Sequence, residues 1–97
     1  MPVTVVTTFT KADASTEDYV NPEVEKVYEE YQNSNKVNDS QRSRSKDGLV
    51  QERTRVFIDQ ETWDAFKLED AVVKNKALRL IWCEDNNVKM SQTIVSK

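Results

Sequence analysis

The chain has 97 residues, 37% of them hydrophobic and 32% charged, and its formal net charge is −3 at pH 7. This length allows one domain with a single small core, and the apolar content excludes disorder throughout the chain. The acidic balance argues against nucleic-acid binding, because proteins that neutralise phosphates carry a basic excess. We therefore expect one domain over residues 1–97, whose partner is another protein or a second copy of itself.

Rare residue types exclude several classes of site. The chain has no histidine, which excludes Ser–His–Asp and Cys–His catalysis and histidine-ligated metals. One glycine is too few for a glycine-rich phosphate loop, and one cysteine, Cys83, cannot form an intramolecular disulfide. No apolar run approaches the ~20 residues of a membrane span. We expect a soluble cytoplasmic protein with no catalytic residues, no metal ligands, no cofactor and no membrane contact.

The N-terminal third of the chain predicts a strand and a helix. β-branched residues dominate positions 3–10, which we predict to be a strand. Asn21 followed by Pro22 is typical of a helix start. Apolar residues at helical spacing then extend the predicted helix over residues 22–32.

The segment 33–48 is polar and has two interpretations, a loop or an edge strand. Asp47-Gly48 is a strong hairpin turn signal, and a clear strand follows it. We therefore favour an edge strand at about residues 39–46.

The remainder of the chain predicts a strand, two helical segments and a last strand. Side chains in residues 49–58 alternate between two sets, as in a strand. Trp63 and Phe66 mark the apolar side of a short helix. The later elements are the strand 49–58, the helix 60–68, a second helical segment from Asp70, and the strand 88–96.

The resulting order, β-α-β-β-α-β, matches the ferredoxin-like motif, whose first and third strands lie at the centre of the sheet. The first and third predicted strands are the most apolar, and the polar second strand suits an edge that resists aggregation. We predict an α+β fold with a four-stranded antiparallel sheet and helices on one face.

The string RVFIDQETWDAF, residues 55–66, leads from a strand into a helix through an acidic residue and an aromatic ring. It resembles the third-strand-to-helix junction of dimeric α+β barrel proteins, the group that includes antibiotic-biosynthesis monooxygenases. The haem-degrading branch of that group uses a histidine, which this chain lacks. The Thr/Val-rich opening and the Asp-Gly-Leu hairpin at residues 47–49 also resemble small proteins of tailed bacteriophages. The first resemblance implies a small enzyme or ligand-binding protein, and the second a phage origin.

Four arginines form the most informative charge pattern. Arg42 and Arg44 are two residues apart, as are Arg53 and Arg55, so each pair shares one face of its strand. The cluster is either a patch for an anion or acidic partner, or an edge that resists aggregation. Like charges side by side also require a neutralising partner. Glu25, on the predicted first helix, is expected to face solvent.

Four aromatic residues are candidates to line a pocket between the helices and the sheet: Tyr28, Trp63, Phe66 and Trp82. The alternative is that they fill the core, because so short a chain has few other large side chains. A pocket lined by Trp63 and Trp82 that is open, with a polar base, would favour a small enzyme or ligand-binding protein. A filled one would favour an interaction module.

The sheet face opposite the helices is the expected interface. If the third strand turns Phe57 outward, this face mixes apolar anchors with arginine, a blend enriched at protein interfaces. The candidate interface residues are Val6, Leu49, Arg53, Arg55 and Phe57.

Together these observations lead us to expect a non-enzymatic interaction or structural module, a homodimer or the partner of another protein, phage-encoded and located in the host cytoplasm. The alternative is a small enzyme or ligand-binding protein of the dimeric α+β barrel type.

Overall fold

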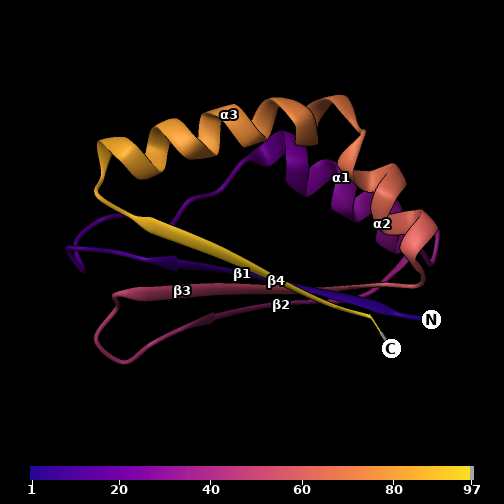
Figure 1. Cartoon of the computed structure of the whole chain (residues 1–97), viewed down its shortest axis with the longest axis horizontal. Helices are drawn as coiled ribbons and strands as arrows, with labels where there is room; N and C mark the ends of the chain where they lie inside the picture. The colour runs from indigo at the N-terminus through magenta and orange to yellow at the C-terminus, as the bar shows by residue number, and fades with distance from the viewer. Residues whose placement is uncertain (97) are drawn as a thin grey trace.

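The computed structural model describes residues 1–96, without the side chains of residues 39, 40 and 96. The four strands pair in the antiparallel order β2-β3-β1-β4, and the helices lie on one face of the sheet (Figure 1). The predicted ferredoxin-like α+β fold is confirmed. The elements are β1 (Val3–Thr10), α1 (Pro22–Asn33), β2 (Val37–Arg44), β3 (Val50–Phe57), α2 (Gln60–Lys67), α3 (Asp70–Asp85) and β4 (Lys89–Ser96).

Local sequence signals explain where the helices and the hairpin begin. The side chain of Asn21 accepts hydrogen bonds from backbone N–H groups in the first turn of α1, where Pro22 also lies. Asp59 caps α2 by accepting a hydrogen bond of 2.8 Å from the N–H of Thr62. Gly48 has a φ of +74°, in the left-handed region that glycine adopts without strain, and turns the chain from β2 into β3.

The central and edge strands are those predicted from apolar content. β1 and β3 are central, and β2 and β4 lie at the edges. β2 has a register shift between Val37 and Asp39 and is mostly polar, which discourages pairing with another chain. The polar segment 33–48 thus contains an edge strand and a hairpin turn rather than one long loop.

The orientation of β3 differs from the expected one. Val3 of β1 pairs with Phe57, and both are fully buried, so Phe57, Arg55 and Arg53 lie on the face that the helices cover. Phe57 is 0% exposed, and its ring centre is 5.0 Å from that of Trp63 on α2. The prediction that these three residues face away from the helices is wrong, because Phe57 fills the core beneath α1 and α2.

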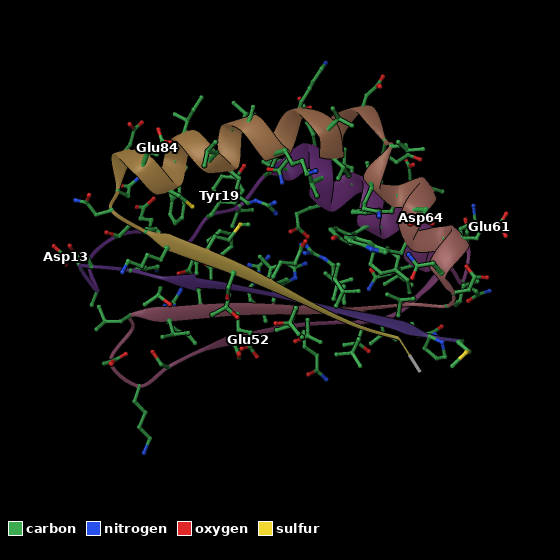
Figure 2. The ribbon with its side chains drawn as sticks, in the orientation of Figure 1. Asp13, Tyr19, Glu52, Glu61, Asp64 and Glu84 are labelled. Carbon is green, nitrogen blue, oxygen red and sulfur yellow. The ribbon has the colours of Figure 1, made fainter. Side chains whose placement is uncertain are left out.

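The opposite face of the sheet carries no helix. Val6 of β1 and Val56 of β3 lie on this face and are half-buried by their neighbours in the sheet. Glu52 projects from the same side in Figure 2. Of the candidate interface residues, Val6 is on the expected face, and Leu49 is a half-buried residue just before β3.

Two apolar clusters stabilise the packing of the helices on the sheet. The larger lies beneath α1 and α2 and includes the rings of Tyr28, Trp63 and Phe66. The smaller lies under the C-terminal part of α3, where Trp82 meets Phe9 edge to face with ring centres 5.6 Å apart. No helix in residues 1–96 is long and apolar enough to cross a membrane.

Candidate functional site

Three arginines from the β2–β3 hairpin surround one carboxylate. Glu25 of α1 accepts two hydrogen bonds from Arg53, of 3.0 and 2.9 Å, and one from Arg55 of 3.3 Å. Arg42 approaches the same carboxylate to 3.5 Å. Glu25 is therefore the neutralising partner that the arginines require, and its side chain is only 32% exposed. The expectation that Glu25 faces solvent is wrong, because these ion pairs draw it against the sheet.

Arg55 is the most buried of the three, with a side chain 12% exposed. Its guanidinium carbon lies 3.3 Å from the ring centre of Tyr28, a cation–π contact. Burial lowers the pKa of Arg55 to about 10, so the side chain remains cationic at neutral pH. Burial also raises the pKa of Tyr28 to about 12, so its ring remains neutral. The Nε atom of Arg55 is buried and has no hydrogen-bond partner among the described residues.

A second polar group centres on Asn75, which is buried on the sheet-facing side of α3. The Oδ1 atom of Asn75 accepts hydrogen bonds from the hydroxyl of Tyr19 and, at 3.0 Å, from the side-chain amide of Asn21. Gln51 of β3 bonds both the N–H and the carbonyl of Tyr19, at 3.2 and 3.4 Å. Tyr19 accordingly lies between α3 and the sheet (Figure 2). These bonds fix the chain just before α1 to both layers.

A cavity of about 140 Å³ lies between the sheet and the helices. Tyr28, Trp63 and Phe66 contribute aromatic walls to it, whereas Arg55 and Asn75 contribute polar groups. A smaller cavity of about 50 Å³ adjoins the first, since Arg55 and Asn75 line both. The site therefore combines an apolar, aromatic part with a polar, cationic part.

An apolar groove of about 550 Å³ lies between α3 and β4. Leu80 and Met90 are among its lining residues, together with the buried Cys83. Lys76 and Arg79 line both this groove and the 140 Å³ cavity. Lys76 and Arg79 therefore form a common border of the groove and the cavity.

The structure divides the four arginines of the predicted patch. Arg42, Arg53 and Arg55 meet at Glu25, whereas Arg44 pairs with Asp18 in the segment before α1. Arg53 and Arg55 are turned inward, with side chains 14% and 12% exposed, whereas Arg42 and Arg44 remain largely exposed. Whether the cluster also binds an anion stays a prediction.

The candidate pocket residues are divided as well. Tyr28, Trp63 and Phe66 line the 140 Å³ cavity, but Trp82 belongs to the smaller apolar cluster with Tyr19. Tyr28, Trp63 and Phe66 thus pack in the core and also line a cavity within it. The hollow beside Trp63 is open and has polar groups in its wall, but Trp82 does not line it, so it meets only part of the condition set for a ligand-binding protein.

Sequence reasoning missed Asn75 and Arg79. Both lie on the sheet-facing side of α3, one turn apart, and both line the two cavities. The sequence did contain a signal for them. Asn75 and Arg79 lie on the same helical face as Val72 and Trp82, where a helix would ordinarily bury apolar side chains. Within the described part of the chain, no group of His, Cys, Asp and Glu residues is arranged to hold a metal ion.

Comparison with solved structures identifies the fold. The chain is similar to Rv0793 from Mycobacterium tuberculosis, with 11% sequence identity, a TM-score of 0.63, and coverage of 100% of this chain and 95% of that one. It is similar to a mutant form of SnoaB, a cofactor-independent oxygenase from Streptomyces nogalater, with 15% identity, a TM-score of 0.62, and coverage of 99% and 92%. SO0527 from Shewanella oneidensis matches with 11% identity, a TM-score of 0.59, and coverage of 98% and 93%.

These identities establish a shared fold. No family model matches the sequence, and no curated protein matches it. The structures are of the SnoaB-like, dimeric α+β barrel type to which the strand-to-helix junction was compared. The resemblance to bacteriophage proteins receives no support from them.

The comparison also corrects the expected function. A non-enzymatic interaction or structural module is contradicted, because a structure that matches over nearly the whole chain is an oxygenase. The alternative, a small enzyme or ligand-binding protein, is the better supported.

Proposed function

We propose that this chain binds a small planar organic molecule in the cavity between the sheet and the helices, as a small enzyme or ligand-binding protein of the dimeric α+β barrel type. One observation carries the proposal: a cavity of about 140 Å³ has the rings of Tyr28, Trp63 and Phe66 on one part of its wall and Arg55 and Asn75 on another. Ligand sites typically combine apolar surface with a few polar groups that fix orientation.

The size and the walls of the cavity indicate the size of the ligand. Its volume of about 140 Å³ is close to the ~150 Å³ of an engineered protein cavity that binds benzene. Aromatic walls favour a flat, unsaturated molecule, since offset or edge-on ring contacts add to the gain from burial. A single six-membered ring with one small substituent is therefore the matching ligand.

The enzymatic form of the proposal is oxygenation of the bound molecule by O₂, with the substrate itself supplying the electrons. SnoaB, which shares the fold, is a cofactor-independent oxygenase. The histidine-free cavity of this chain supports a reaction in which the residues bind, orient and desolvate the substrate. Arg55 and Asn75 would supply the polar contacts that fix its orientation.

The two tryptophans provide a direct test of binding. Each indole N–H gives its own signal in a ¹H–¹⁵N spectrum, and a Trp82→Phe variant assigns the two signals. We expect titration with benzamide, a neutral single-ring probe, to shift the Trp63 signal in a saturable way. Trp82 does not line this cavity, so its signal is the internal control. Equal shifts of both signals, or no shift with either benzamide or its anionic analogue benzoate, would contradict the proposal.

A further inference from the structure

We propose that the ligand of this cavity is an aromatic carboxylate, whose ring lies between the aromatic residues and whose carboxylate is bound by Arg55 and Arg79. This inference rests on the proposed function and adds the chemical class of the ligand. It comes from the charge of the cavity wall, from a cation without a partner, and from the shape of the two adjoining hollows.

The charge of the inner wall is opposite in sign to that of the protein. Arg55 and Arg79 line both cavities and Arg53 lines the smaller one, where Glu25 is the one carboxylate among the described lining residues. The inner wall therefore has a net charge of +2, in a chain whose overall formal charge is −3. Lys76 adds further positive charge where the larger cavity meets the surface, whereas Lys67 at the same edge is paired with Asp64 at 3.0 Å. A hollow with low-dielectric walls and an excess of one sign concentrates ions of the other sign.

Arg79 is the arginine of the cavity wall that forms no ion pair with another described residue. Glu25 already accepts hydrogen bonds from Arg53 and Arg55 and forms an ion pair with Arg42. In the described part of the chain, no hydrogen bond or ion pair involves Arg79, although its side chain is half-buried. It lines both cavities and the groove between α3 and β4, so it stands where a ligand would enter.

Arg55 supplies the second contact from the sheet side. Its Nε donor is buried without a partner, and such a donor is destabilising unless an acceptor comes to lie next to it. Tyr28 covers one side of the guanidinium by cation–π stacking and holds it in place. An acceptor that carries negative charge would satisfy the donor and offset the low pKa that burial imposes on this side chain.

The geometry favours a carboxylate over a larger anion. The cavity of about 50 Å³ next to the arginines has room for a group of only a few atoms, and the cavity of about 140 Å³ has room for the ring. The guanidinium fork matches the two oxygens of a carboxylate. The aromatic residues border the larger cavity. We therefore expect the ring of the ligand to lie nearer to α2 and its carboxylate to lie further from α2, next to the arginines.

Benzoate and benzamide test this inference, because the two probes differ in charge but hardly in shape. We expect benzoate to bind wild-type protein about tenfold more tightly than benzamide, as charge-assisted hydrogen bonds are about twice as strong as neutral ones. Arg79→Gln should weaken benzoate binding about tenfold and change benzamide binding less than about twofold. The Trp63 indole signal reports both titrations and shows that the probe is in the cavity.

Lys74→Gln is the matched control, since it removes the same charge from an exposed position of α3 that lines none of the cavities. It should leave both affinities unchanged. If benzamide shifts the Trp63 signal but benzoate binds no better, or if Lys74→Gln weakens benzoate as much as Arg79→Gln does, the inference is overturned and the proposed function stands. If neither probe shifts the Trp63 signal, both fail. Circular dichroism of each variant confirms that it is folded.

Discussion

The two faces of β3 differ in a way that simple alternation would assign partly in reverse. The covered face of β3 carries Gln51, Arg53 and Arg55 beneath the helices in addition to Phe57, whereas its bare face carries Val56 as well as Glu52. Ordinarily the polar set faces solvent and the apolar set faces the core. Here the covered face bounds the cavities, and its polar residues are paired with Glu25 or with the segment before α1. Polar residues on the helix-covered side of a strand, where apolar residues are expected, thus mark the candidate site.

The largest expected effect on stability comes from introducing a negative charge on the covered face of β3, compared with the same charge on its bare face. Phe57→Asp should abolish folding, a loss above about 5 kcal/mol, because it removes a fully buried ring and buries a carboxylate without a partner. Val56→Asp, one residue away on the bare face, should cost only about 1 kcal/mol. Urea denaturation measures both. Similar midpoints for the two variants would reverse the face assignment.

Removing each tryptophan compares the two apolar clusters. Trp63 is 5% exposed in the larger cluster, and Trp63→Ala should destabilise the protein by about 3–5 kcal/mol. Trp82 is half-buried in the smaller cluster, so Trp82→Ala should cost about half as much. Thermal and urea unfolding provide the values. A larger loss for Trp82 would mean that the smaller cluster carries more of the stability than its burial indicates.

Glu25→Gln tests whether the inward arginines depend on one carboxylate. We expect a loss of about 1–3 kcal/mol, because breaking an ion cluster leaves cations unpaired and because a side chain 32% exposed is partly screened by water. Glu29→Gln, one turn further along α1 and exposed, is the control and should change stability by less than about 0.5 kcal/mol. Equal effects would show that the charge of the helix, rather than the cluster, is responsible.

The smallest effect on folding is predicted for the bare face, where we predict self-association. Val6→Asp should keep the fold, as judged by circular dichroism, and should convert a dimer into a monomer in sedimentation at about 100 μM protein. Leu78→Asp changes an exposed apolar residue of α3 and should leave the dimer intact. A monomeric wild-type protein, or dissociation by Leu78→Asp instead, would contradict this use of the sheet face.

The order and boundaries of the elements could be predicted because they depend on local signals. Asn21, Gly48 and Asp59 fix the ends of helices and the hairpin, and the apolar content of each strand predicts whether it is central. The edge strand expected at 39–46 is found at Val37–Arg44, with its turn at the expected glycine.

Which side chains of β3 face the helices could not be predicted. Alternate residues of a strand point to opposite faces of the sheet, and the local sequence does not determine which set is covered. The choice depends on contacts distant in sequence: Glu25 pairs with Arg53 and Arg55 some thirty positions later, and Phe57 meets aromatic rings from two helices. Asn75 was missed for the same reason. Its partners precede α1, and nothing nearby in α3 indicates them.

The segment between β1 and α1 determines where this chain can change in length. Residues 12–15 are exposed, and Asp13 bonds only its near neighbour Ser15 within that stretch. Residues 18–21 are different, because Asp18, Tyr19 and Asn21 each bond a residue of another element. An insertion after Ala14 would therefore form a harmless surface bulge. One added residue after Tyr19 would move Asn21 and the start of α1 away from Asn75 of α3, so homologous chains should vary in length on one side of Asp18 and keep it on the other.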